Sequence, residues 1–153
     1  MVERLRRGLP GLWLGWGLCV ALLATPAGFA LLPPAEAGRL AGRMLAQDAY
    51  TSLALGLLLI MLERRAGRDA FEANQGSQFT AGLALAAAAV FCTVLGYFGV
   101  QPLMPGARIG QGPLSFGQLH AVSVAFFVVK MACVAALAWR ALGTMVRPTG
   151  PAS

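Results

Sequence analysis

The hydrophobic pattern divides the chain into four long apolar segments separated by short polar or proline-rich breaks. The segments at residues 12–32 and 79–100 contain no charged residue. Each is close to the length of about 20 apolar residues that a membrane-spanning helix needs. The last segment, at 116–141, is equally long and has Lys130 inside its apolar run. These three segments predict membrane-spanning helices.

The second apolar segment is less regular than the others. Its charge-free run covers only residues 49–62, which is too short to span a bilayer, and a longer run has to include Asp48. Pro33 and Pro34 end the preceding segment, and a proline can occupy the first turn of a new helix. We therefore predict one long helix over residues 35–63, whose first half emerges from the membrane or lies along its surface.

The four segments together predict the fold class. We expect an all-α polytopic membrane protein, an antiparallel four-helix transmembrane bundle that forms a single domain over residues 1–143. We expect residues 144–153 to form a disordered tail.

The first segment shares features with a cleaved signal peptide, because arginines precede it and small residues end it. Its apolar stretch exceeds the roughly 7–15 residues of such a signal, so we favour a retained helix.

Basic residues mark one end of the predicted bundle. The amino terminus, the break after the second helix and the carboxyl end carry Arg4, Arg6, Arg7, Arg64, Arg65, Arg68, Arg140 and Arg147. The opposite side carries Arg39, Arg43 and Arg108. Positive charge favours the cytoplasmic side, so we expect both termini in the cytoplasm and the protein in the cell inner membrane. Trp13, Trp16 and Trp139 would then lie at the cytoplasmic interface, where aromatic side chains are enriched.

Composition excludes the main soluble classes. Hydrophobic residues make up 58% of the chain even without glycine, against about 45–50% with glycine in soluble domains. Charged residues make up only 12%, about half the usual share of about 25%. The net charge of +6 does not indicate nucleic-acid binding, because the basic residues lie at the ends of apolar spans. The partner that this composition predicts is the lipid bilayer.

Lys130 is the most informative polar residue. It lies ten residues before Arg140, or about 15 Å along a helix, which is near the middle of a bilayer. A lysine there costs at least about 2.5–3.5 kcal/mol, so it usually faces the bundle interior and has a partner. Asp48 lies about 22 Å from the cytoplasmic end of the antiparallel helix, roughly 7 Å deeper than Lys130, and the flexible lysine side chain can bridge most of that gap. We therefore predict a buried Asp48–Lys130 interaction. The alternatives are a lysine that extends to the interface, or a pair that only locks two helices together.

His120 lies one turn into the last predicted helix and begins a polar face. Ser123, Phe127 and Lys130 follow at spacings that keep all four within about 80° of one another. This face should point into the bundle. A single histidine is more often a hydrogen-bonded structural residue than a ligand, and metal sites need further donors. We therefore predict no cofactor, with haem or copper at His120 as the alternative.

Arg39 and Arg43 lie one helical turn apart near the start of the second helix. Such basic turns commonly meet lipid phosphates, and the functional alternative is an entrance for an anion or substrate. Two glycine pairs with four-residue spacing, Gly11/Gly15 and Gly38/Gly42, would let helices approach closely. They make a homo-oligomer or a partner membrane protein conceivable.

Two short stretches resemble a known family. Residues 25–45, TPAGFALLPPAEAGRLAGRML, and residues 116–123, FGQLHAVS, resemble a helix junction and the opening of the last helix in small membrane proteins catalogued as domain of unknown function 4149. That family includes proteins similar to transmembrane protein 205. The resemblance implies a four-helix bundle without established activity, with Arg39, His120 and Ser123 as shared functional positions. More distant copper-resistance proteins and a four-helix protoporphyrinogen oxidase use several histidines, whereas this chain has only His120.

The sequence therefore predicts an integral membrane protein of unestablished activity. It shows no nucleophile paired with a base, no phosphate-binding glycine loop and no paired catalytic carboxylates, so we favour a non-enzymatic role. The expected feature is a polar-lined bundle interior for a small ligand, lipid or partner helix, formed by Arg39, Arg43, Asp48, His120, Ser123 and Lys130. The alternatives are a membrane redox, metal or haem-handling protein that uses His120, and an oligomeric small-molecule permease.

Overall fold

The computed structural model describes residues 1–143, and within that range every regular element is a helix. The first pass joins α1 (Val2–Leu18), a π-helical turn η1 (Cys19–Ala24) and α2 (Thr25–Leu31). The second pass is α3 (Pro34–Glu72). The third joins α4 (Ala81–Thr93), a second π-helical turn η2 (Val94–Gly99), a 3₁₀ turn η3 (Gln101–Leu103) and α5 (Met104–Arg108). The fourth is α6 (Phe116–Gly143). The tail expected at residues 144–153 lies outside the described residues.

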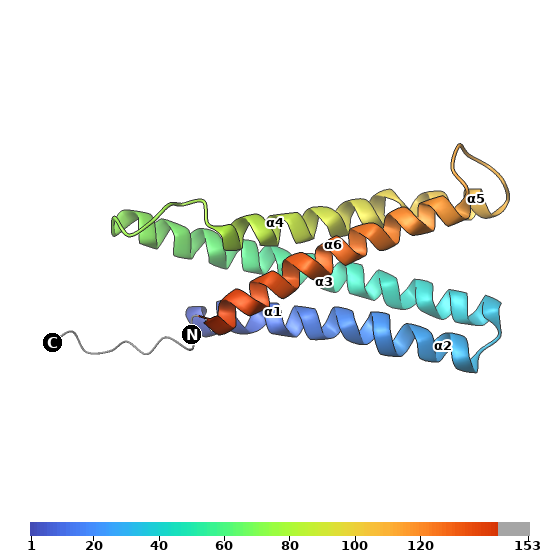
Figure 1. The fold of residues 1–153 in the computed structure, drawn as a ribbon, viewed down its shortest axis with the longest axis horizontal. Coiled ribbons are helices and arrows are strands. Elements are labelled where there is room, and N and C mark those ends of the chain that lie inside the picture. The colour runs from blue at the N-terminus through green and yellow to red at the C-terminus, as the bar shows by residue number, and fades with distance from the viewer. Residues whose placement is uncertain (144–153) are drawn as a thin grey trace.

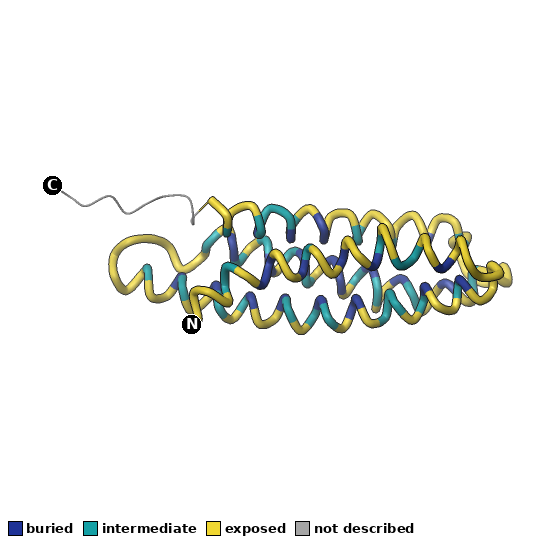
Figure 2. Tube along the Cα trace, turned by 90° about the horizontal axis from the view of Figure 1, so that it is seen from below, coloured by how far each residue is buried: buried dark blue, intermediate teal, exposed yellow. Residues whose placement is uncertain are grey.

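The chain passes back and forth along the long axis of the molecule, and the end of α6 returns to the side of the N-terminus (Figure 1). All four passes are long and apolar enough to cross a membrane, which confirms the predicted all-α membrane fold. Large apolar side chains such as Leu22, Leu57, Phe91 and Val128 are exposed. Figure 2 shows buried positions alternating with exposed ones along each pass. The exposed apolar surface is the surface that lipid would cover.

The second helix extends beyond its expected end at residue 63. α3 continues to Glu72 and stops where Asn74 adopts a left-handed conformation with φ 54°. The Gln75 N–H donates to the Ala70 carbonyl, and the Asn74 N–H donates to the Phe71 carbonyl, which is the Schellman pattern of helix termination. The apolar pattern marks the end of the membrane-spanning part, whereas this local backbone stop marks the end of the helix.

The first and third passes also differ from the expected bounds. α1 begins at Val2 instead of residue 12, because Glu3 pairs with Arg6 and Arg7 one turn later at 2.8 and 2.7 Å. The proline-rich break after residue 100 continues as helical turns over residues 101–108. The irregular loop begins only after Arg108, where Gly110 and Gly112 take positive φ values that suit glycine.

The four passes pack tightly in one half of the bundle and separate in the other. Near the N-terminal end, one core cluster of buried residues joins all four passes: Trp13, Leu59, Ala86, Ala89, Val134 and Leu137. At the opposite end α2 packs on α3, and α6 packs on η2 and α5. There α2 does not pack on α6, and Figure 1 shows the α2–α3 pair diverging from the α5–α6 pair. The fold therefore has a closed half and a splayed half.

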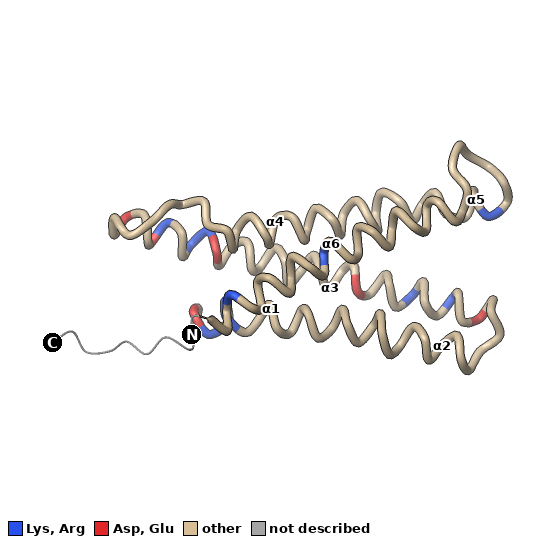
Figure 3. Tube along the Cα trace, in the orientation of Figure 1, with Lys and Arg blue, Asp and Glu red and all other residues tan. Residues whose placement is uncertain are grey.

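Charged residues concentrate at the two ends of the molecule, with two exceptions (Figure 3). One acidic position on α3 and one basic position on α6 lie near mid-length, where the closed and splayed halves meet. These positions are Asp48 and Lys130, and both side chains are buried.

Candidate functional site

Lys130 and Asp48 form a buried ion pair between α6 and α3. The Lys130 Nζ donates to Asp48 Oδ2 at 2.6 Å and to Ser52 Oγ at 3.3 Å. The interaction predicted from the sequence is therefore confirmed. The Trp13 indole N–H donates to the same Ser52 oxygen at 3.0 Å, which adds α1 to the network. Trp13 is thus a core residue with 1% exposure.

The local sequence explains why these groups meet. Asp48 and Ser52 lie one turn apart on α3 and therefore share a face. Gly56 follows on the next turn, and a Cβ there would lie within 3 Å of the Trp13 ring. Gly17 plays the matching role on α1, because a Cβ there would meet the Met131 sulfur. The two glycines let three helices close around the charged groups.

The ion pair is well enclosed but incompletely hydrogen-bonded. The Lys130 ammonium also lies 4.5 Å from the centre of the Phe127 ring, a cation–π distance. The Oδ1 oxygen of Asp48 is buried and has no hydrogen-bond partner among the described residues. An unpaired buried acceptor costs about 1–3 kcal/mol, so the charge compensation by Lys130 has to hold Asp48 in place.

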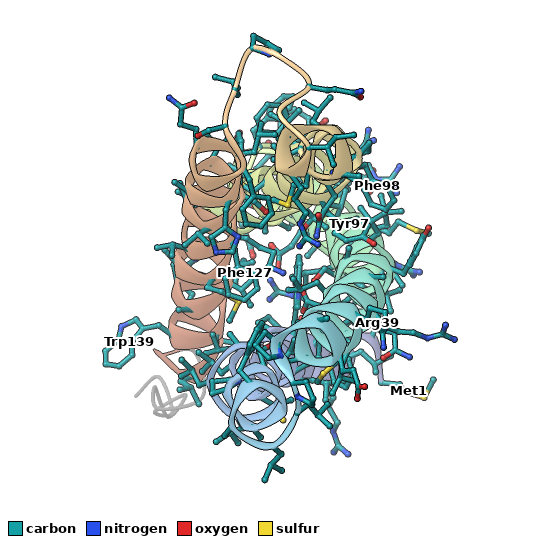
Figure 4. All side chains as sticks on the ribbon, turned by 90° about the vertical axis from the view of Figure 1, so that its right-hand side faces the viewer. Met1, Arg39, Tyr97, Phe98, Phe127 and Trp139 are labelled. Atoms are coloured by element: carbon teal, nitrogen blue, oxygen red, sulfur yellow. The ribbon has the colours of Figure 1, made fainter. Side chains whose placement is uncertain are left out.

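A cavity of about 1010 Å³ begins at the ion pair and extends through the splayed half. It lies between α2 and α3 on one side and η2, α5 and α6 on the other. Most of its wall is apolar or glycine: Ala21, Phe29, Pro34, Ala35, Gly38, Ala41, Gly42, Leu45, Ala49, Cys92, Gly96, Met104, Ala107, Phe116, Val124 and Phe127. Figure 4 looks into the molecule from this end, and Phe127 projects from α6 toward the central space.

The polar side chains along the length of the cavity are already hydrogen-bonded. Thr25 Oγ1 donates to the Val20 carbonyl at 2.8 Å, and Thr93 Oγ1 donates to the Ala89 carbonyl at 2.9 Å. Ser123 Oγ donates across the helix interface to the Gly96 carbonyl at 3.2 Å. These hydroxyls therefore use their hydrogens to stabilise the π-helical turn, the helix or the interface on which they lie, and they have no donor left for a ligand.

The mouth of the cavity has a different character. The Arg108 guanidinium lies 4.7 Å from the centre of the Phe116 ring, and the His120 ring stacks on Phe116 with a centroid distance of 5.9 Å. Tyr97 and Gln101 also line the cavity. Within residues 1–143, the side chains of Arg108, His120, Tyr97 and Gln101 have no hydrogen bond or ion pair.

The structure brings together four of the six residues singled out from the sequence. Asp48, Lys130, Ser123 and His120 line the cavity, with Phe127 on the same face of α6. The other two, Arg39 and Arg43, are exposed and lie outside the cavity wall, and Figure 4 shows Arg39 pointing away from the interior.

The glycine pairs of the sequence have a different environment from the expected one. Gly38 and Gly42 lie on the cavity wall, and a Cβ on either would meet nothing within 4 Å. They do not serve a close helix contact within the chain and instead widen the cavity. Gly11 and Gly15 are equally unobstructed and lie on the outer surface of α1.

His120 has no companion donors of the usual kind. No group of three His, Cys, Asp or Glu side chains within residues 1–143 is arranged to hold a metal ion. The immediate neighbour of the imidazole is the Phe116 ring. The metal and haem alternatives therefore remain predictions that depend on a single histidine.

A second polar cluster ties the closed half together. Arg6 Nη1 donates to Glu63 Oε1 at 2.9 Å, and the Thr80 hydroxyl donates to Glu63 Oε2 at 3.3 Å. Gly82 leaves room for this carboxylate, since a Cβ there would overlap it. The cluster joins α1, α3 and α4 beside a smaller cavity of about 270 Å³.

Sequence reasoning missed Ser52, Arg108 and Gln101. Ser52 lies four residues after Asp48, and this spacing on one helical face was a usable signal. Arg108 was counted only as a charge on one side of the membrane, because the segment around it contains many glycines and prolines. The short helix α5, which carries Arg108 to the cavity, has no clear hydrophobic periodicity.

Comparison with known proteins gives one match. The sequence profile of the family described as Domain of unknown function (DUF4149) matches residues 9–111, which is more than half of the chain. No curated protein matches the chain, and no solved structure matches it. The matched range covers the first three passes with the cavity wall from Ala21 to Arg108. The chain belongs to the DUF4149 family, as a multi-pass membrane protein of that family.

Proposed function

We propose that the chain binds a small lipid-like molecule in the cavity of the splayed half, without catalysing a reaction. The observation that carries this proposal is the cavity of about 1010 Å³, which has a largely apolar wall and ends at a buried ion pair. Small-molecule sites are typically concave and mostly apolar, with volumes of about 300–1,000 Å³. This cavity is at the upper end of that range.

The form of the cavity favours a binding site that is closed at its inner end. Its inner end meets the Asp48–Lys130 pair, and beyond the pair lies the packed core around Trp13 and Leu59. Because α2 does not pack on α6, an aliphatic chain could enter sideways from the bilayer between them. A site closed at one end suits uptake and release of a ligand better than passage through the bundle.

The membrane placement is part of the proposal. The distribution of arginines supports both termini on the cytoplasmic side of the inner membrane. In that orientation the mouth near Arg108 opens at the non-cytoplasmic interface. The ion pair then lies close to the middle of the bilayer.

The test fills the cavity without disturbing the fold. Gly42→Leu adds a side chain where nothing lies within 4 Å, and Gly15→Leu adds the same side chain at an equally open position outside the cavity. Leucine is the better helix former by up to about 1 kcal/mol, so both variants should fold. The probe is tetradecanol with a photoreactive diazirine near the chain end, added to protein in phosphatidylcholine nanodiscs.

We expect light-induced labelling of wild type at cavity residues such as Ala49, Cys92 and Thr93, mapped by peptide mass spectrometry. Gly42→Leu should reduce this labelling at least fivefold, and Gly15→Leu should leave it unchanged. Labelling spread evenly over lipid-facing residues such as Leu57 and Val128, with no effect of Gly42→Leu, would contradict the proposal.

A further inference from the structure

We infer that the ligand is a single-chain amphiphile with an anionic oxyacid head, which Arg108 binds at the mouth while the aliphatic chain extends toward Lys130. This inference depends on the proposed lipid-binding function and adds the chemical class and the orientation of the ligand.

The first argument is where unused hydrogen-bonding capacity lies. Along the cavity and at its inner end the donors are already used, because Thr25, Thr93 and Ser123 donate to backbone carbonyls and Lys130 donates to Asp48 and Ser52. The capacity that remains there belongs to acceptors, the hydroxyl oxygens and Asp48 Oδ1, which a deprotonated oxyacid head cannot use because it has no donor. At the mouth, the side chains of Arg108 and His120 have no hydrogen bond among the described residues, and Arg108 offers several donors. The polar end of a ligand therefore belongs at the mouth.

The second argument is the charge of the wall. The charged residues that line the cavity are Asp48, Lys130 and Arg108. Asp48 and Lys130 neutralise each other at 2.6 Å, so one positive charge remains, at Arg108. The Arg108 guanidinium lies over the face of the Phe116 ring, and this contact leaves its N–H groups available to an acceptor. A guanidinium presents a planar fork of donors that matches a carboxylate or a phosphate.

The third argument is length. His120 at the mouth and Lys130 at the inner end are ten residues apart on α6, which is about 15 Å of helix. An extended chain advances about 3.3–3.6 Å per three bonds, so roughly 12–14 bonds cover this depth. A linear chain of about that many carbons places its head beside Arg108 and its end against Phe127 and Lys130.

The same head chemistry has two sources, a free alkyl carboxylate or phosphate and a bilayer phospholipid. We commit to the free single-chain molecule. The cavity volume of about 1010 Å³ is of the size of a small-molecule site, and the ion pair closes its inner end.

The experiment compares three diazirine probes in phosphatidylcholine nanodiscs: tetradecanoate, tetradecanol and phosphatidylglycerol. We expect wild type to bind tetradecanoate about tenfold more tightly than tetradecanol, since a charged hydrogen bond is worth at least a factor of this order. The variant Arg108→Gln should remove the preference, and Arg108→Lys should keep part of it. The matched control is Arg39→Gln, at an exposed arginine of the same end that does not line the cavity.

Each outcome bears on a separate claim. Equal binding of acid and alcohol to wild type, or a preference that survives Arg108→Gln or is lost in Arg39→Gln, overturns the anionic head while the lipid-binding function stands. Cavity labelling by phosphatidylglycerol that exceeds labelling by tetradecanoate and falls in Arg108→Gln overturns the single-chain commitment. Absence of cavity labelling by all three probes overturns the proposed function itself. Labelling near Ala49 and Cys92 by chain-end tetradecanoate supports the orientation.

Discussion

Lys130 carries its charge in the middle of an apolar helix, and the surrounding side chains make that position tolerable. Asp48 supplies the opposite charge, Ser52 a second acceptor and Phe127 an aromatic face. The unfavourable insertion of each charge is offset only while both are present. A buried pair of this kind contributes little net stability compared with apolar residues, but removing one member leaves the charge of the other buried without a partner.

The pair gives a direct prediction at the residue scale. Lys130→Met alone or Asp48→Leu alone should lower the free energy of unfolding by about 3–5 kcal/mol, because an uncompensated charge remains in a dry interior. The double variant should be within about 1 kcal/mol of wild type. The measurement is thermal unfolding in detergent together with the accumulated amount of protein. A double variant no more stable than either single variant would show that the two charges are not coupled.

The residues of the site could be predicted from the sequence in part. A charge inside an apolar run requires a partner, and depth along antiparallel helices identified Asp48. The signal for the acceptor Ser52 is only its spacing of four residues from Asp48 on one helical face. The donor Trp13 has no such signal, because a tryptophan is ordinary in a membrane helix. Arg39 and Arg43 were included among the interior candidates because their charge is conspicuous, but both are exposed on α3, where arginines commonly meet lipid phosphates.

At the scale of elements, the spans follow hydropathy and the helix ends follow local backbone chemistry. The four apolar segments all became helices, as their length required. α3 nevertheless runs on to Glu72 through a polar stretch, because its stop is Asn74 in a left-handed conformation. Hydropathy is an average over many residues, so it cannot show where a helix ends when the end depends on a single residue.

Glycines within the helices give a second prediction, because some are required and others are not. Gly67 faces the Gln78 backbone, where a Cβ would lie 2.7 Å from the carbonyl oxygen, so Gly67→Ala should push the α3–α4 loop away. We expect a loss of about 1–3 kcal/mol from this overpacking. Gly11→Ala, with nothing within 4 Å, should instead gain up to about 1 kcal/mol of helix propensity. Thermal unfolding of the two variants measures the contrast, and similar midpoints would refute the close approach at Gly67.

At the scale of the whole molecule, the division into a closed and a splayed half was not predictable from the sequence. The residues that line the cavity, such as Ala41, Leu45 and Val124, are of the same types as those that fill a packed helix interface. Gly38 and Gly42 were interpreted as a helix contact because small residues serve both purposes. Only the geometry distinguishes space between helices from contact between them.

The orientation of the whole molecule gives a third prediction. Ser77 and Ser115 are exposed and lie in loops at opposite ends of the bundle. If both termini are cytoplasmic, Ser115→Cys should react with a membrane-impermeant maleimide in right-side-out membrane vesicles. Ser77→Cys should react only after the vesicles are permeabilised. The reverse pattern would invert the orientation and move the cavity mouth to the cytoplasmic side.

The two π-helical turns determine which side chains face the cavity. η1 and η2 occur on the first and third passes, at the point where each leaves the closed half. A π turn holds one residue more than an α turn, so it advances the helical phase of everything after it by about 100°. Thr25 and Phe29 on one pass, and Gln101 and Arg108 on the other, reach the cavity in this shifted phase. Which side chains line the cavity therefore depends on the number of residues in η1 and η2 as well as on the residue types. Loss of a single residue within either turn would rotate its half of the wall toward the lipid while every side chain type stayed the same.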